Sequence, residues 1–232
     1  GGTIETKDES VDCIYNYGKL TVESGIIKGD GGIRNFGVLY FNDGTVEADN
    51  YPAIANYNDS TVYVYDGVLK GGKNSGAVEN GGTLYVYGGE IESIVNVNDA
   101  YISGGKIDRD DYVALNLLGG TVEITGGSFT GTDNEYGRHS GTPYGEWTVC
   151  YNEGATLILK GGEFPNGFVA DETTVNALLA EGYAFYDKDG NKITVADDST
   201  KIEGYVQVKE RFVASVTDKD GNELEGAPYK TF

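Results

Sequence analysis

Residues 80–91 read N-G-G-T-L-Y-V-Y-G-G-E-I, and this stretch decides the fold. Leu84 and Val86 alternate with tyrosines, which is the period-two pattern of a β-strand with one apolar face. A Gly-Gly pair then breaks the strand, and Ile91 follows two residues after Gly89. The stretch therefore predicts a short strand, a sharp turn at a glycine and a second strand.

The same stretch recurs along residues 1–164 as a repeat of three elements. The first is a glycine followed two residues later by an apolar side chain: Gly2/Ile4, Gly25/Ile27, Gly44/Val46, Gly67/Leu69, Gly89/Ile91, Gly105/Ile107, Gly127/Phe129 and Gly162/Phe164. The second is an apolar pair five and three residues before each glycine from the second one on: Leu20/Val22, Leu39/Phe41, Val62/Val64, Leu84/Val86, Ala100/Ile102, Val122/Ile124 and Leu157/Leu159. The third is an Asn, 9 to 11 residues before those glycines, with an apolar or small residue two positions earlier: Ile14/Asn16, Ile33/Asn35, Ile54/Asn56, Val78/Asn80, Ile94/Asn96, Ala114/Asn116 and Cys150/Asn152. Each repeat therefore predicts three short strands separated by turns.

The repeats differ in length at one place, the connection between the glycine strand and the Asn strand. Successive glycines lie 23, 19, 23, 22, 16, 22 and 35 residues apart. A coil that accepts insertions at one corner and keeps its other corners fixed is a parallel β-helix, and parallel crossovers are nearly always right-handed. We expect an all-β, right-handed parallel β-helix solenoid of about eight rungs, with inward apolar ladders and a stack of Asn amides bonded along the rod.

This pattern resembles known β-helices. The Asn ladder, the aliphatic stacks and the G-x-apolar turns look like right-handed parallel β-helices of the pectate-lyase-like type. The cadence N-x-G-x-L-x-V-x-G-G-x-I resembles β-helical repeat regions of large surface proteins of Gram-positive bacteria. The resemblance covers residues 1–164 and implies an extracellular location on a bacterial cell surface. It leaves function open, because the fold hosts both enzymes and inert stalks.

The sequence after Pro165 has a different pattern. Residues 173–182 predict a short helix with a Thr cap and a terminating Gly, and residues 183–195 predict a hairpin around an Asp-Gly turn. We therefore expect residues 165–212 to form a small α+β C-terminal cap over the open strand edges of the solenoid. Residues 213–232 predict a linker or the start of a following module, so neighbouring modules of the same polypeptide are expected partners.

Charge and composition exclude several partners. The chain has 37 acidic and 17 basic residues, a net charge of −20, which repels nucleic acid and anionic membrane surfaces. No apolar run approaches the length of a membrane-spanning helix. The chain contains no Met, even at position 1, so we expect it to be a segment of a longer polypeptide with any export signal or wall anchor outside it.

Six tyrosines occupy outward positions of the strands before the glycines, on four adjacent rungs: Tyr40, Tyr63, Tyr65, Tyr85, Tyr87 and Tyr101. Tyrosine offers a large rigid contact area and a hydroxyl, so these residues are candidates for binding a sugar or a protein. The alternative is a stabilising ladder of in-register aromatic neighbours, shielded in part by the cap.

The connection 130–149 is the one long insertion, and it carries a second set of candidate binding residues: Tyr136, Arg138, His139, Tyr144 and Trp147. Long connections within a compact solenoid are often functional, and this composition is typical of recognition sites. The alternative is an insertion that only packs on the rod. Without a second His or a reactive Cys, the connection offers no nucleophile and base pair.

Acidic residues gather at the variable corner: Asp8, Glu9, Asp12, Asp30, Glu47, Asp49, Asp108, Asp110, Asp111, Asp133 and Glu135. Carboxylates stacked along one edge could hold Ca²⁺ or face a basic partner, although no spacing repeats as a metal loop would, and a solvated edge is the alternative. The two Asp-Lys-Asp-Gly-Asn segments are expected to be turns, because their glycine position does not fit a calcium loop.

A catalytic alternative depends on Asp43 and Asp66, which precede the turn glycines of successive rungs. Stacked carboxylates at such positions would lie near the separation used by retaining glycosidases, whereas Asp-Gly is also a favoured turn step. Cys13 and Cys150 are expected to be free thiols, because Cys150 takes the place of Ile14 six rungs further on.

The expected function is a non-catalytic extracellular β-helical module of a bacterial surface protein, acting as a stalk and as an adhesive surface for a glycan or a host surface protein. One alternative is a polysaccharide lyase or glycoside hydrolase on a β-helix scaffold. The other is a purely structural spacer.

Overall fold

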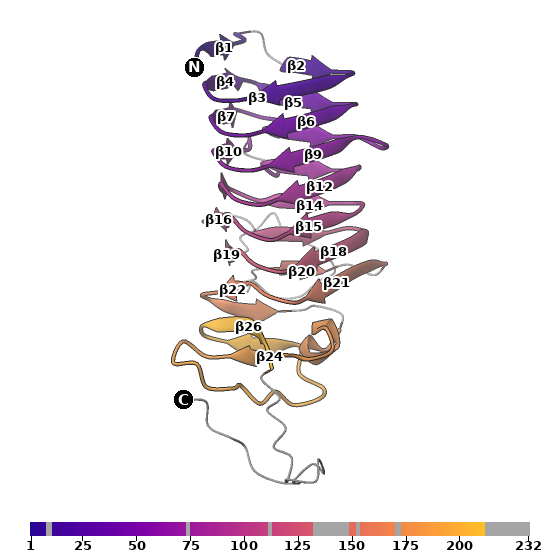
Figure 1. Ribbon diagram of the computed structural model, residues 1–232, viewed down its shortest axis with the longest axis vertical. Helices are drawn as coiled ribbons and strands as arrows, with labels where there is room; N and C mark the ends of the chain where they lie inside the picture. The colour runs from indigo at the N-terminus through magenta and orange to yellow at the C-terminus, as the bar shows by residue number, and fades with distance from the viewer. Residues whose placement is uncertain are drawn as a thin grey trace, which may run out of the picture.

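The computed structural model describes residues 1–7, 11–72, 75–110, 113–131, 149–151, 154–169 and 173–211. This part of the chain forms an all-β parallel solenoid with almost no helix. The rungs stack along the long axis of the molecule (Figure 1). The predicted all-β parallel solenoid is therefore confirmed.

Three sheets run along the rod, and each rung contributes one strand to each of them. The first contains β1 (Thr3–Glu5), β4 (Ile26–Gly29), β7 (Thr45–Ala48), β10 (Val68–Lys70), β13 (Glu90–Ile91), β16 (Lys106–Arg109), β19 (Ser128–Gly131) and β22 (Glu163–Phe164), followed by β26 (Val206–Glu210) and β24 (Tyr183–Tyr186). The second contains β2 (Asp12–Asn16), β5 (Gly31–Asn35), β8 (Ile54–Asn56), β11 (Val78–Asn80), β14 (Ile94–Asn96), β17 (Leu115–Leu117) and β20 (Val149–Tyr151). The third contains β3 (Lys19–Val22), β6 (Val38–Phe41), β9 (Thr61–Val64), β12 (Thr83–Val86), β15 (Ala100–Ile102), β18 (Gly120–Ile124) and β21 (Ala155–Leu159).

The solenoid has about six turns, and the expected number of eight is wrong. The expectation counted glycine corners, but eight corners enclose only seven intervals. The last interval, between Gly127 and Gly162, passes through residues 132–148, which lie outside the described residues. Counting corners therefore overestimates the number of complete turns.

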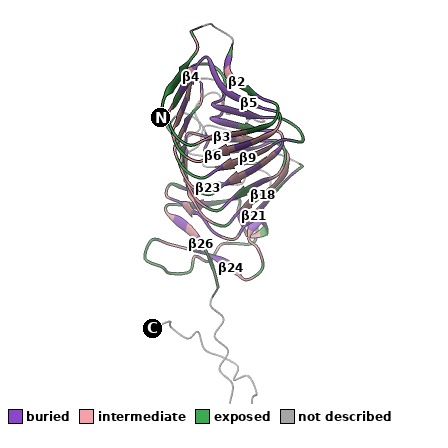
Figure 2. Ribbon diagram, turned by 45° about the horizontal axis from the view of Figure 1, so that its top comes forward, coloured by how far each residue is buried: buried purple, intermediate pink, exposed green. Residues whose placement is uncertain are grey.

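The core lies inside the coil and is built from the predicted apolar ladders. Along β6, β9 and β12 the side chains alternate between buried and partly exposed, as period two requires. Leu39, Val62 and Leu84 occupy one fully buried ladder. Buried residues follow the strands along the length of the rod (Figure 2).

Glycine corners allow the rungs to stack closely. Seven of the eight predicted corner glycines have positive φ, and Gly2 does not. At Gly44, with φ +114°, a Cβ atom would lie 2.7 Å from the carbonyl oxygen of Gly25. Both the backbone conformation and the close contact therefore require glycine there.

An Asn ladder joins five rungs at the turn between the second and third sheets. Asn16, Asn35, Asn56, Asn80 and Asn96 are stacked. Each Nδ2 donates to the Oδ1 of the next Asn, at 2.6, 2.9, 2.7 and 2.7 Å along the series. These side chains are buried, and their amides also donate to backbone carbonyls of the next rung. The predicted bonding along the rod is confirmed for these five rungs.

The predicted register is wrong by one residue beyond Asn96. Leu117, not Asn116, lies beside Asn96 in the sheet. Asn116 in turn lies beside Cys150, so Val149 rather than Cys150 continues the ladder of Ile14. A buried leucine fills the inward position there and packs in the apolar core.

The C-terminal segment differs from its prediction in its helix. Residues 175–178 form a single 3₁₀ turn, η1 (Val175–Leu178), instead of a longer helix. Val175 and Leu178 are both buried, and residues three apart share one side of a 3₁₀ turn. The Asp-Gly turn is present, because Asp187 Oδ1 accepts the backbone N–H groups of Asp189 and Asn191.

The strand pairing of this segment also differs from a simple hairpin. β24 pairs along its length with β26, and only one bridge joins Tyr186 to Lys192. β26 pairs antiparallel with β22, and β23 (Gly167–Val169) pairs antiparallel with β25 (Lys201–Glu203). The parallel stacking of the first sheet therefore ends at β22. A cap formed by 165–212 is not confirmed, and the boundaries 1–164, 165–212 and 213–232 stay predictions.

Candidate binding face

The six predicted tyrosines lie together on the outer surface of the third sheet and are called the tyrosine face below. Strands β6, β9, β12 and β15 carry them. Tyr40, Tyr63, Tyr85 and Tyr101 occupy one in-register row. Tyr65 and Tyr87 begin a second row, just beyond the ends of β9 and β12. One continuous aromatic surface results.

The tyrosine rings are stacked along the rod. In the longer row the ring centroids are 5.0, 4.9 and 5.1 Å apart, with interplanar angles of 7°, 7° and 14°. The pair Tyr65 and Tyr87 is stacked at 5.0 Å. Nearly parallel rings this close are offset from one another's planes, because rings lying side by side in one plane would collide. Each ring therefore packs against its neighbour, which covers part of its face.

The face is partly open to solvent. Tyr65, Tyr87 and Tyr101 are 44, 47 and 39% exposed, while Tyr63 and Tyr85 in the middle of the longer row are partly buried. Burial raises the pKa of the Tyr63 phenol, and the neighbouring Tyr40 and Tyr85 raise it further. The six residues thus support one another as a ladder and still leave a contact surface. The structure therefore shows the ladder, and a role of these side chains in binding stays a prediction.

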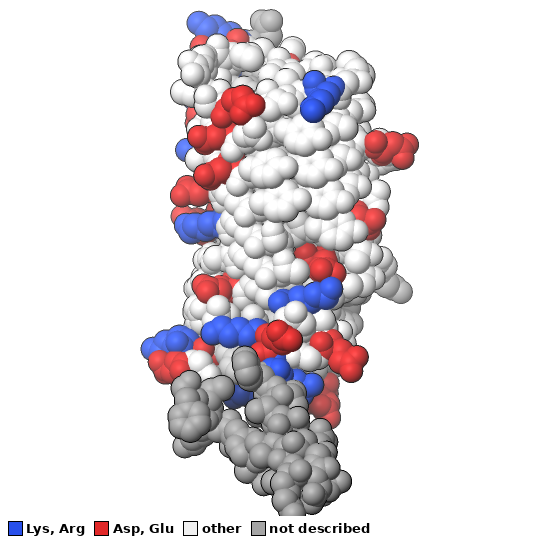
Figure 3. Space-filling view, in the orientation of Figure 1, with Lys and Arg blue, Asp and Glu red and all other residues white. Residues whose placement is uncertain are grey.

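The middle of this surface carries no charge. The outward positions of β6, β9, β12 and β15 hold Tyr, Thr and Val, and Asn42 and Ser103 follow β6 and β15. None of these side chains is charged, and the corresponding area is uncharged in Figure 3. At one end Lys19 lies 4.8 Å above the ring of Tyr40. At the other end Lys160 Nζ pairs with Glu123 at 2.8 Å. The tyrosine face is therefore a neutral strip bordered by charged residues.

A second aromatic stack, which the sequence reasoning missed, lies at the turn after the Asn ladder. Tyr17, Phe36 and Tyr57 stack at 5.0 and 4.5 Å. Arg34 lies 5.7 Å from the ring of Tyr57 and forms an ion pair with the buried Asp12. The missed signal was the residue directly after each ladder Asn, which is aromatic in three successive rungs.

Asp43 and Asp66 act as turn acceptors. Asp43 Oδ1 accepts the backbone N–H of Gly44 at 2.6 Å, and Asp66 Oδ1 accepts that of Gly67 at 2.8 Å. Both side chains are exposed at the corner. This local bonding explains both residues without a catalytic role.

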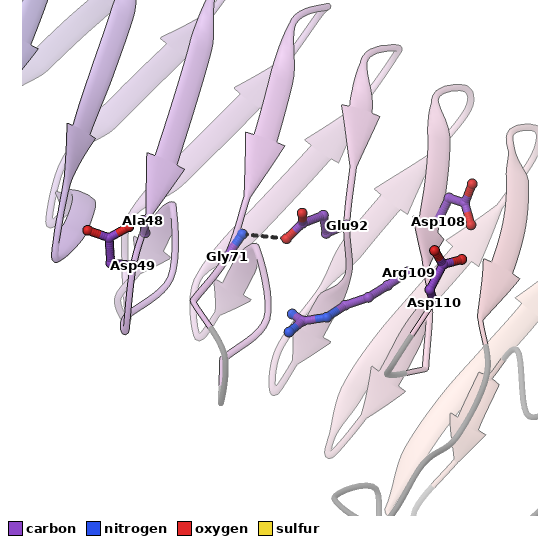
Figure 4. Close-up of a pocket in the computed structure, with 7 residues that line it drawn as sticks. All are labelled: Ala48, Asp49, Gly71, Glu92, Asp108, Arg109 and Asp110. Atoms are coloured by element: carbon purple, nitrogen blue, oxygen red, sulfur yellow. Dashed lines mark hydrogen bonds between the residues drawn. The ribbon is translucent and has the colours of Figure 1, made fainter.

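A pocket of about 420 Å³ lies at the variable corner, between the connections of successive rungs (Figure 4). Ala48, Asp49, Gly71, Glu92, Asp108, Arg109 and Asp110 line it. Its polar groups bind the backbone: Glu92 accepts the N–H of Gly71 at 2.9 Å, and Arg109 donates to the carbonyls of Ser75 and Gly72. These contacts fix the connection between β10 and β11, which is a structural role.

The acidic corner is only partly described. Asp12 and Asp30 are buried, and Glu47 and Asp108 form ion pairs with Lys28 and Lys106. In the described ranges, no group of three or more His, Cys, Asp or Glu side chains is arranged to hold a metal ion. Asp8, Glu9, Asp111, Asp133 and Glu135 lie outside the described residues. The suggestion of Ca²⁺ gains no support from this arrangement.

Other sequence predictions fall outside the described residues. Tyr136, Arg138, His139, Tyr144 and Trp147 all lie in 132–148. Cys13 is a free thiol that donates to the carbonyl of Lys28 at 3.2 Å. The state of Cys150 stays a prediction.

In the described part of the chain, no helix is both long and apolar enough to cross a membrane. The chain matches no protein-family model, no curated protein and no solved structure.

Proposed function

We propose that this chain is a non-catalytic β-solenoid module of an extracellular bacterial surface protein, which acts as a stalk and binds partners through the tyrosine face. The observation that carries the proposal is the neutral aromatic strip on a chain of net charge −20. Contiguous exposed aromatic surface on a soluble domain is a common mark of an interaction site. The resemblance to pectate-lyase-like helices and to Gram-positive surface repeats supports the location and the stalk role.

The ring geometry favours a protein surface over a glycan as the ligand. Sugar rings stack on whole aromatic faces, whereas the rings at 4.9 to 5.1 Å in this row cover one another. A protein surface can pack on the exposed parts of the rings without needing their hydroxyl groups, and tyrosine is enriched in such interfaces. A host surface protein is therefore the ligand class we favour, and a glycan is the second candidate.

The test measures binding of the chain to arrays of host extracellular proteins and of glycans. The double substitution Tyr63→Ala/Tyr85→Ala removes the middle of the longer row and is expected to weaken binding roughly tenfold or more. The matched control is Tyr15→Ala/Tyr51→Ala, which removes two exposed tyrosines elsewhere on the rod. Unchanged binding by the first variant would refute the site.

A conservative variant separates the two ligand classes. Tyr63→Phe/Tyr85→Phe keeps the rings and removes the hydroxyl groups. Binding of a protein surface that packs on the exposed parts of the rings should change little, while binding of a glycan that depends on hydroxyl hydrogen bonds should weaken. If the chain binds to neither array, the spacer alternative holds.

A further inference from the structure

We propose that the tyrosine face pairs with the tyrosine face of a second copy of this chain. The inference rests on the proposed function, because it takes this face as the binding surface and adds another copy of this chain as a partner beside the host protein. It follows from the charge distribution, from the repetition of the face along the rod and from its size.

Charge limits where two copies can meet. Each chain carries a net charge of −20, so most approaches place acidic surfaces against each other. The outward rows of β6, β9, β12 and β15 form a strip without charged side chains on the described surface (Figure 3). Two copies that meet through this strip keep their acidic corners apart. The neutral strip is therefore the place where self-association costs least.

The ends of the strip are also suited to an identical partner. Lys19 and Glu23 lie at the end nearest the N-terminus, and Glu123 and Lys160 lie at the other end. Each end thus carries one base and one acid. A second copy can face the strip in either direction along the rod and still place opposite charges within reach at both ends.

The repetition of the face provides a matching register. Tyrosine rings recur every 4.9 to 5.1 Å along the longer row. A two-fold axis makes the same patch contact itself, so both partners present rows of identical spacing. Successive rungs can then make equivalent contacts, which a partner without this repeat cannot do.

The size of the face indicates weak pairing. Four strands at ~4.8 Å and about six residues at ~3.3 Å give a face on the order of 400 Å² per copy. Standard stable interfaces bury about 800 Å² on each partner. We therefore expect a reversible, concentration-dependent dimer, whose strength on a surface would come from many copies acting together.

The experiment is sedimentation analysis of the full chain over a range of protein concentrations, at low and at high salt. Dimerisation should increase with concentration and should become stronger at high salt, because salt screens the repulsion between the two acidic bodies. A basic protein attracted to the acidic corner would show the opposite salt dependence. A chain that stays monomeric at every concentration and salt level overturns the inference.

Two variants place the dimer on this face. Tyr63→Glu/Tyr85→Glu should weaken association roughly tenfold or more. The control, Tyr15→Glu/Tyr51→Glu, adds the same charges elsewhere on the rod and should weaken association only slightly. Ser103→Glu adds a charge to the face without removing a ring, so it tests the site even if the double variant does not fold. Association that survives Ser103→Glu in a folded chain contradicts the proposed face.

Failure of this inference differs from failure of the proposed function. If the chain is monomeric but Tyr63→Ala/Tyr85→Ala abolishes binding to a host protein or a glycan, the face is a binding site and the second copy is not its partner. If the chain is monomeric and the double variant also binds as before, both proposals are wrong.

Discussion

Asn56 is the side chain at which the ladder can be tested most sharply. It is 3% exposed. Its Nδ2 donates to Asn80 Oδ1 at 2.7 Å and to the carbonyl of Thr83 at 3.2 Å, and its Oδ1 accepts from Asn35 at 2.9 Å and from Ser60 at 2.5 Å. The side chain therefore connects three rungs through four hydrogen bonds.

Asn56→Ala removes a donor from the buried Oδ1 of Asn80 and from the partly buried carbonyl of Thr83 at once. Each buried polar group that loses its partner costs about 1–3 kcal/mol, so we expect the free energy of unfolding to fall by roughly 2–5 kcal/mol. The exposed amide of Asn42, which donates to Glu23 at 2.8 Å, provides the control. Asn42→Ala should stay within about 0.5 kcal/mol of the unsubstituted chain.

The assay is urea unfolding followed by circular dichroism, with amide hydrogen exchange as the local measure. Solenoid rungs contact only their neighbours, so the loss should appear first as faster exchange in β8 and β11. Asn56→Asp keeps an acceptor but removes both donors, and it should be destabilised at neutral pH and partly restored by acid. If Asn56→Ala unfolds at the same urea concentration as Asn42→Ala, the ladder does not hold the rungs as argued.

Three further predictions concern the turns. Gly67→Ala should lower the free energy of unfolding by roughly 3 kcal/mol or more, because φ is +95° and the new Cβ would lie 2.6 Å from a backbone oxygen. Gly190 also has a positive φ, of +80°, but open space around it, so Gly190→Ala should cost only about 1 kcal/mol. Thermal unfolding of the two variants tests this difference. The hydrogen bonds from Asn191 lower the pKa of the Asp187 carboxyl. The ionised Asp187 therefore stabilises the fold above its usual pKa, and this stabilisation is lost as pH falls through the lowered pKa. Carboxyl NMR titration should show the pKa of Asp187 rising again in Asn191→Ala. Asp66→Asn should leave stability within about 0.5 kcal/mol, since the amide oxygen still accepts the next N–H, and any polysaccharide-cleaving activity that this substitution abolished would instead favour the enzyme alternative.

The fold could be predicted because the residues that specify it are chemically distinctive. Few other residues can replace a glycine at a corner with positive φ or an Asn in a buried amide ladder. Their spacing in the sequence therefore shows where each rung begins and ends. The error at Asn116 has the same origin. The spacing of Asn116 fits a ladder position, whereas the strand pairing places Leu117 beside Asn96. The identity of a single residue predicts the strand register less well than the pattern of inward apolar residues does.

The candidate site was predicted in part. The outward row of tyrosines follows from strand alternation alone, which is why Tyr63 and Tyr85 were found. The stacking of their rings depends on side-chain rotamers, and the alternation rule does not supply those. The stack of Tyr17, Phe36 and Tyr57 was missed because it lies in a turn, where no period-two pattern applies.

The central claim is that the tyrosine face is the surface through which this chain binds. Chemical footprinting of tyrosines, read by mass spectrometry, tests it directly by comparing dilute chain with concentrated chain or with chain saturated by a host protein ligand. Protection should be confined to Tyr65, Tyr87 and Tyr101, which are the exposed members of the face, while Tyr15 and Tyr51 react as before. Protection of Tyr15 and Tyr51 with the face still reactive would contradict the account.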